Sequence, residues 1–168
     1  IFVVAADISP SGAMAKFQKS NNNFVNVGVA EQNMIGVCAG LAMSGKTVFA
    51  YTIATFSIYR PFEMVRDDIC YQNLPITVVG MGAGTIYANL GGTHTAIEDI
   101  SIARSIPNMT VISPCDPLEL ISAVNYCCTK NTSPTYLRIG KSGEKNITKG
   151  AVEKWKFGKI RKIFNGKN

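Results

Sequence analysis

The stretch that decides the fold is residues 24–43, which read FVNVGVAEQNMIGVCAGLAM. Its first part places Val25, Val27 and Val29 on one face, an alternation typical of a β-strand. From Glu31 onward, apolar residues recur with the period of an α-helix. These helical residues are Met34, Ile35, Cys38, Leu41 and Ala42. A strand that leads within a few residues into an apolar helix is the building unit of α/β proteins.

The same alternation continues in both directions along the chain. Further apolar strands are predicted at residues 1–6, 47–51, 76–80, 110–112 and 135–139. Helical stripes are predicted at Ile58, Phe62, Val65 and Ile69, at Ile97 and Ile100, and at Leu118, Ile121, Val124 and Cys128. Crossovers of this length imply parallel pairing, so we expect a three-layer α/β/α fold with a mostly parallel sheet. Ligands of such folds bind at the carboxyl ends of the strands.

The composition is that of one globular domain. The chain has 168 residues, of which 46% are hydrophobic and 17% charged, and this excludes a disordered protein. No apolar run approaches the roughly 18–20 residues of a membrane helix, and no signal peptide opens the sequence. The five cysteines form no Cys-x-x-Cys pair, which disfavours a disulfide framework or a structural zinc site. We therefore expect a reducing, cytoplasmic setting.

The net charge of +6 is concentrated in the last residues. From Ala151 onward six basic residues face one acid, whereas the first 150 residues hold 11 basic and 10 acidic residues. A short basic tail of this kind is usually solvated, so we expect no nucleic-acid partner. Residues 155–166 resemble a strand and a turn. We interpret residues 142–168 as a basic linker toward a C-terminal domain that this sequence lacks.

A glycine-rich turn follows the strand at residues 76–79. Gly80, Gly82 and Gly84 imitate a dinucleotide-binding turn, but the third glycine of that fingerprint and the helix after it are missing. A nicotinamide- or flavin-binding module is therefore disfavoured. The glycines are better explained as the start of a long loop that leaves the sheet.

Glu31 is the most informative carboxylate. As a first-turn acid it could simply complement the helix dipole. Its predicted surroundings are almost wholly apolar and small, however, and such surroundings disfavour an ionised carboxyl, as acid–base groups require.

Four ordered segments carry a family resemblance. They are FVNVGVAEQNM at residues 24–34, ATF at 54–56, GGTHTAIEDI at 91–100 and IPNMTVISPCDP at 106–117. Together they resemble the pyrimidine-binding domain of transketolase and of deoxyxylulose-phosphate synthase, over residues 1–141. Within the family the chain is most similar to the separate C-terminal subunit of split transketolases.

The resemblance implies thiamine diphosphate as cofactor and assigns residues to it. A glutamate at the position of Glu31 hydrogen-bonds N1′ of the aminopyrimidine in this family and tunes its protonation. Phe56 matches the ring that stacks on the pyrimidine, and Tyr59 and Phe62 match the rest of that aromatic wall. Phe56 and Phe62 could alternatively be core residues.

The resemblance also assigns substrate contacts. His94, the single histidine, matches a residue that contacts substrate hydroxyls and the reacting groups. Ser11 matches a serine that contacts the phosphate of a sugar phosphate. Lys141 stands where the family commonly has a phosphate-binding arginine, so contact there would be less directional. Leu90 and Gly82 stand where the family carries an aspartate and a second histidine, so selection of the usual pentose-pathway substrates should be weak.

The family holds magnesium and the diphosphate through a Gly-Asp-Gly motif, which this chain lacks. The resemblance therefore implies a diphosphate-binding partner subunit or domain, in a homodimer or heterotetramer, for transfer of a two-carbon ketol unit between sugars. No metal ligand is assigned to this chain. Two alternatives remain: the β component of a 2-oxoacid dehydrogenase, and a non-catalytic binding module that kept the fold.

Overall fold

The computed structural model describes residues 1–10, 12–20 and 22–166, and its centre is a six-stranded sheet. Every neighbouring pair of strands is parallel, in the order β2-β1-β3-β4-β6-β5. The strands are β1 (Phe2–Ala5), β2 (Phe24–Asn26), β3 (Val48–Ile53), β4 (Ile76–Met81), β5 (Thr110–Ile112) and β6 (Thr135–Ile139). All six strands predicted from the sequence are present, and the parallel α/β class is confirmed.

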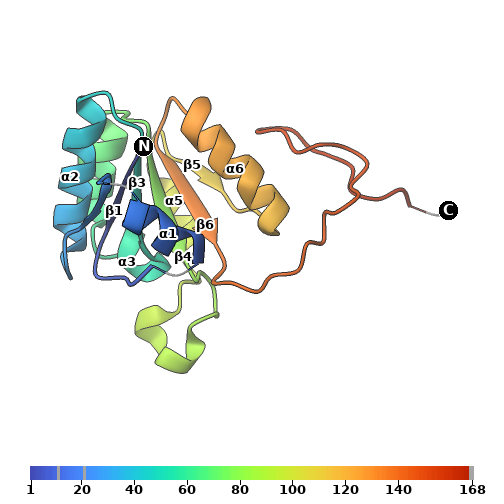
Figure 1. The fold of residues 1–168 in the computed structure, drawn as a ribbon, viewed down its shortest axis with the longest axis horizontal. Coiled ribbons are helices and arrows are strands. Elements are labelled where there is room, and N and C mark those ends of the chain that lie inside the picture. Colours follow the sequence, from blue (N-terminus) through green and yellow to red (C-terminus); the bar gives the residue numbers. More distant parts are fainter. Residues whose placement is uncertain (11, 21, 167–168) are drawn as a thin grey trace.

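Helices cover both faces of the sheet and make the three layers (Figure 1). One face packs against α2 (Glu31–Met43), α3 (Ala54–Ile58), the π-helix η1 (Val65–Tyr71) and α5 (Asp99–Ser105). The other face packs against α1 (Gly12–Ser20) and α6 (Pro117–Thr129). Successive residues of one strand serve opposite cores, since Val48 belongs to the first and Phe49 to the second. Burial on both faces explains why the strands are continuously apolar.

The predicted helix over residues 58–69 is wrong as a single helix. α3 ends at Ile58, a turn follows over residues 59–61, and α4 (Phe62–Met64) then runs into η1. Pro61 lies in that turn, and a proline has no backbone N–H to continue the helix and disfavours helical geometry before it. The apolar period is present in the structure, but the proline inside it interrupts the helix.

Two further differences concern the elements beside it. Strand β2 ends at Asn26, short of Val27 and Val29, because Gly28 adopts a φ of +75° that turns the chain toward α2. Ile97 precedes α5 and is exposed, so it belongs to no core stripe. Helix α1 had no counterpart among the predicted elements.

A long loop joins β4 to α5 and projects beyond the sheet in Figure 1. It contains two short 3-10 turns, η2 (Ala88–Leu90) and η3 (Gly92–His94), and an antiparallel bridge between Gly84 and Ala96 closes its base. This arrangement confirms that the glycines after β4 begin a loop rather than a dinucleotide-binding turn.

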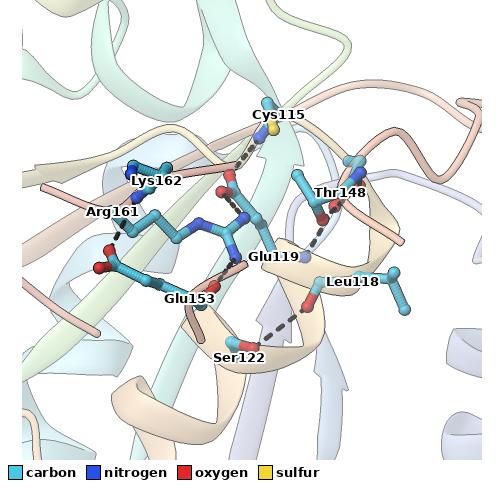
Figure 2. A network of polar contacts seen from close by, with 9 residues as sticks. Cys115, Leu118, Glu119, Ser122, Thr148, Glu153, Arg161 and Lys162 are labelled. Carbon is cyan, nitrogen blue, oxygen red and sulfur yellow. Dashed lines mark hydrogen bonds and ion pairs between the residues drawn. The ribbon is translucent and has the colours of Figure 1, made fainter. Parts of the chain in front are cut away.

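Parts of the tail dock on the domain (Figure 2), while every lysine described from residue 151 onward remains exposed. Buried Asp116 caps α6 and its Oδ2 accepts hydrogen bonds from both Thr148 N and Thr148 Oγ1, each at 2.7 Å. Arg161 forms an ion pair with Glu119 of α6, and Trp155 packs against the second core. The predicted strand over residues 155–166 does not form. The role of this tail as a linker stays a prediction.

Candidate functional site

The candidate residues gather at the carboxyl edge of the sheet. Glu31 follows β2, Phe56 follows β3, His94 follows β4 and Lys141 follows β6. Because parallel strands end at the same edge, four segments far apart in sequence meet there. Ser11, another candidate position, lies outside the described residues.

Glu31 is the first residue of α2 and is only 6% exposed. The chain segment that leads into Glu31 is held by Asn26. Its Oδ1 accepts hydrogen bonds from Asp7 N at 3.2 Å and Gly28 N at 3.0 Å. This bracket ties the ends of β1 and β2 together and directs the chain into α2. Glu31 is thereby presented by rigid elements at the rim of the sheet.

The surroundings of Glu31 are less apolar than the sequence suggested. Arg60 Nη1 donates a hydrogen bond to Glu31 Oε1 at 2.6 Å and forms an ion pair with it. The Arg60 side chain is 50% exposed, so the buried carboxylate opens to solvent on the side of this guanidinium. Arg60 lies in the turn that Pro61 creates after α3.

Phe56 adjoins this ion pair and connects it to His94. The guanidinium carbon of Arg60 lies 4.1 Å from the centroid of the Phe56 ring, a cation–π contact. The rings of Phe56 and His94 lie 5.0 Å apart at an interplanar angle of 74°. Phe56 is half-buried and is therefore not a plain core residue.

Tyr59 and Phe62, the other predicted members of the aromatic wall, lie in different surroundings. The Tyr59 hydroxyl donates to Glu98 Oε2 at 2.8 Å and accepts from Glu98 N at 3.1 Å. Burial, followed by this hydrogen bond to Glu98, raises the pKa of Tyr59 to about 12. Tyr59 thus fastens the entrance of α5 to α3. Phe62 starts α4 with its ring 37% exposed, so it is not in the core.

Tyr87 connects His94 to Lys141, and no motif in the sequence pointed to this residue. Its ring lies 6.4 Å from the His94 ring, and Lys141 Nζ lies 4.9 Å from its centroid. The Tyr87 hydroxyl donates to Met81 Sδ at 3.2 Å. A side chain at Gly82 would overlap the Tyr87 ring, which explains why glycine stands there.

A buried polar cluster supports the base of this loop. Asp99 Oδ2 accepts from Tyr136 OH at 2.9 Å and from Arg138 Nε at 2.8 Å. Burial, and then the charge of Asp99, raises the pKa of Tyr136, so the phenol remains a donor. The cluster anchors α5, where the loop with His94 ends, to β6.

Several exposed apolar side chains lie in the same segments as the candidate residues. They are Val29, Phe62, Ile86, Leu90 and Ile97, and each lies in a segment near the carboxyl edge. Apolar side chains grouped around a polar site are typical of a surface that another protein covers. Over residues 1–10, 12–20 and 22–166, no helix is long and apolar enough to cross a membrane. The same part of the chain holds no group of three or more His, Cys, Asp or Glu residues suited to a metal ion.

Fold and site together define a parallel α/β ligand-binding domain with a buried carboxylate beside an aromatic ring. Residues 1–144 match the family described as "Transketolase, pyrimidine binding domain". The chain belongs to this family, which confirms the resemblance drawn from its motifs.

Relatives of known name agree with this membership. An apulose-4-phosphate transketolase subunit of Phocaeicola vulgatus is 31% identical over 167 residues, which cover 99% of this chain and 53% of that protein. The "Putative transketolase C-terminal section" of Methanocaldococcus jannaschii is 35% identical over 170 residues, covering 100% and 54%. This chain therefore spans about half the length of the relatives it matches.

A solved structure described as "Split gene transketolase, inactive beta4 tetramer" has the same architecture. It superposes with a TM-score of 0.73 at 36% identity, over 86% of this chain and 47% of that one.

Proposed function

We propose that this chain is the pyrimidine-binding half of a thiamine diphosphate-dependent, transketolase-like enzyme that moves a two-carbon ketol unit between sugar phosphates. The observation that carries the proposal is Glu31, a carboxylate 6% exposed at the carboxyl edge of the sheet, beside the half-buried ring of Phe56. The names of the relatives, which are subunits or sections of transketolases, support it.

The residues present fit an aminopyrimidine. The Arg60 guanidinium is a planar group that donates an N–H to Glu31 while it lies over the Phe56 ring. An aminopyrimidine is also planar and needs the same two partners, a carboxylate in its plane and an aromatic face. The arrangement therefore already holds a group of the required shape and hydrogen-bonding character.

Each residue then has a defined task. Thiamine diphosphate supplies, when bound, the carbon centre that carries the two-carbon unit. Glu31 would hold the ring nitrogen and exchange a proton there, and Phe56 would keep the ring in its plane. His94, 5.0 Å from Phe56 by ring centroids, would donate to substrate oxygens. Lys141 is exposed beyond Tyr87 and would attract the substrate phosphate as a point charge.

A partner must complete this site. The sequence contains no Gly-Asp-Gly motif, so the diphosphate and Mg²⁺ would be held by a diphosphate-binding subunit or domain, in a homodimer or heterotetramer. The exposed apolar residues around Glu31 would form the interface. The similar split transketolase is described as an inactive β4 tetramer, and we expect this chain alone to be inactive too. Its five free cysteines suit a reducing cytoplasm.

Reconstitution tests the proposal. The chain is combined with a diphosphate-binding partner, Mg²⁺ and thiamine diphosphate, and ketose phosphates are scanned for cofactor-dependent turnover. Glu31→Ala should lower kcat at least about a hundredfold, the scale for losing a proton-transfer group. Glu63→Ala, a charge-matched change of an exposed acid on α4, should leave kcat unchanged.

The same experiment separates the alternatives. Turnover of 2-oxoacids instead of ketoses would identify a 2-oxoacid dehydrogenase component. A non-catalytic module would give no turnover with any donor, and equal activity of Glu31→Ala and the wild type would reject the role of Glu31.

A further inference from the structure

Arg60 makes both of the contacts that the proposed function reserves for the cofactor ring. Its Nη1 lies 2.6 Å from Glu31 Oε1, and its guanidinium carbon lies 4.1 Å from the Phe56 centroid. No assigned role accounts for a guanidinium in this place. One planar group cannot share the same carboxylate oxygen and the same ring face with another.

We propose that Arg60 occupies the place of the aminopyrimidine until the cofactor displaces it. We call this place, between the Glu31 carboxylate and the face of the Phe56 ring, the seat. This inference rests on the proposed function and adds a control of cofactor entry. The class of ligand that the seat accepts is then a planar N–H donor able to stack, whether guanidinium or aminopyrimidine.

Arg60 removes an energetic cost that the chain would otherwise bear without its cofactor and partner. A buried carboxylate without a partner is strongly unfavourable, and before the cofactor arrives Glu31 has no other ion-pair partner among the described residues. Arg60 supplies the missing charge. It also lowers the affinity of the seat for a cofactor that has no partner subunit to hold its diphosphate.

The local structure permits the exchange. Arg60 lies in the short turn between α3 and α4 rather than inside a helix, and half of its side chain is exposed. Because Arg60, unlike Glu31, is half-exposed, water can solvate its guanidinium as the ion pair separates. Once displaced, the guanidinium can be solvated without movement of the buried residues around Glu31.

The test measures thiamine diphosphate binding to the reconstituted complex by titration calorimetry, independently of turnover. Arg60→Ala should lower the cofactor Kd about tenfold, as expected when the fraction of open seats rises from about a tenth to nearly all. The matched control is Arg66→Ala, which removes an exposed arginine paired with Asp67 at 2.6 Å and should leave Kd unchanged.

A second measurement uses the chain itself. Removal of Arg60 leaves Glu31 unpaired, so Arg60→Ala should melt at a lower temperature than Arg66→Ala. Millimolar 2-methyl-4-aminopyrimidine should restore about 2–4 °C to Arg60→Ala and none to the wild type, whose seat is occupied. If Arg60→Ala does not fold, Arg60→Lys keeps the charge without the planar fork and should still lower Kd.

The outcomes are distinct. A cofactor Kd that is unchanged or higher in the Arg60 variants would overturn the inference and make Arg60 a residue that holds the bound cofactor. That result leaves the proposed function intact, because Glu31→Ala tests it separately. If Arg60→Ala lowers the cofactor Kd but Glu31→Ala leaves kcat unchanged, the proposed chemistry is rejected. The inference that Arg60 competes with the cofactor ring is then retained.

Discussion

At the scale of single residues, the site is a continuous series of contacts that starts at a buried acid and ends at an exposed cation. Glu31 contacts Arg60, Arg60 lies over Phe56, and Phe56 meets His94. Tyr87 continues the series from His94 to Lys141. Under the proposed function, this order would put the proton exchange at one end and the phosphate-attracting charge at the other, as a sugar phosphate with its carbonyl near the cofactor would require.

His94 provides the prediction at this scale. In the reconstituted enzyme His94→Ala should lower kcat/KM about a hundredfold, the usual effect of losing one well-placed donor. The half-buried ring contributes little to the core, so the melting temperature should change by less than about 2 °C. Steady-state kinetics and calorimetry decide: normal turnover with a large fall in melting temperature would show that His94 is structural.

At the scale of elements, the tail is attached to the start of α6 by the hydrogen bonds of Thr148 to Asp116, and acid should break this attachment. We call this contact the clasp. Burial works to raise the pKa of Asp116, but hydrogen bonds from Glu119 N, Thr148 and Leu118 N outweigh it and hold that pKa below the ordinary 3.8. A lowered native pKa stabilises the docked tail above pH 3.8, and this stabilisation is lost as the pH falls through the native value.

Trp155, the single tryptophan, reports on the clasp from within the tail. Its fluorescence should shift to the red as the pH falls below about 3.8, when the protonated Asp116 releases Thr148. Asp116→Asn should show the shifted spectrum already at pH 7, and the control Asp67→Asn, an exposed acid, should behave like the wild type. A spectrum of Asp116→Asn equal to that of the wild type at pH 7 would contradict the clasp.

At the scale of the whole molecule, the sequence predicted the sheet far better than the contacts between segments. Strands over residues 110–112 and 135–139 were predicted to the residue, because their β-branched, aromatic and apolar residues favour a pleated, partly buried segment. The break at Pro61 has a local cause, since a proline within an apolar helical period interrupts the helix. Arg60 on Glu31 and Tyr87 beside Gly82 join segments 29 and 5 positions apart through loops, and no periodic pattern encodes such pairings.

The contacts of the tail with the domain also join distant segments, and no periodic pattern in the sequence encodes them. The basic composition of the tail indicated a solvated segment, and its described lysines are exposed. Thr148, Trp155 and Arg161 nevertheless find partners on α6 and the second core that become visible only in three dimensions. The family motifs singled out Glu31, Phe56 and His94, which lie at one edge of the sheet, but no motif pointed to the guanidinium between the first two.

The central claim is that Glu31 sets the proton exchange of the cofactor ring. The most direct test is the rate at which the C2 proton of thiamine diphosphate exchanges with D₂O in the reconstituted complex, measured by NMR after rapid quenching. Glu31→Gln preserves shape and removes the exchangeable charge, so the account predicts a rate at least about a hundredfold below that of the wild type. Equal rates for Glu31→Gln and the wild type would contradict it.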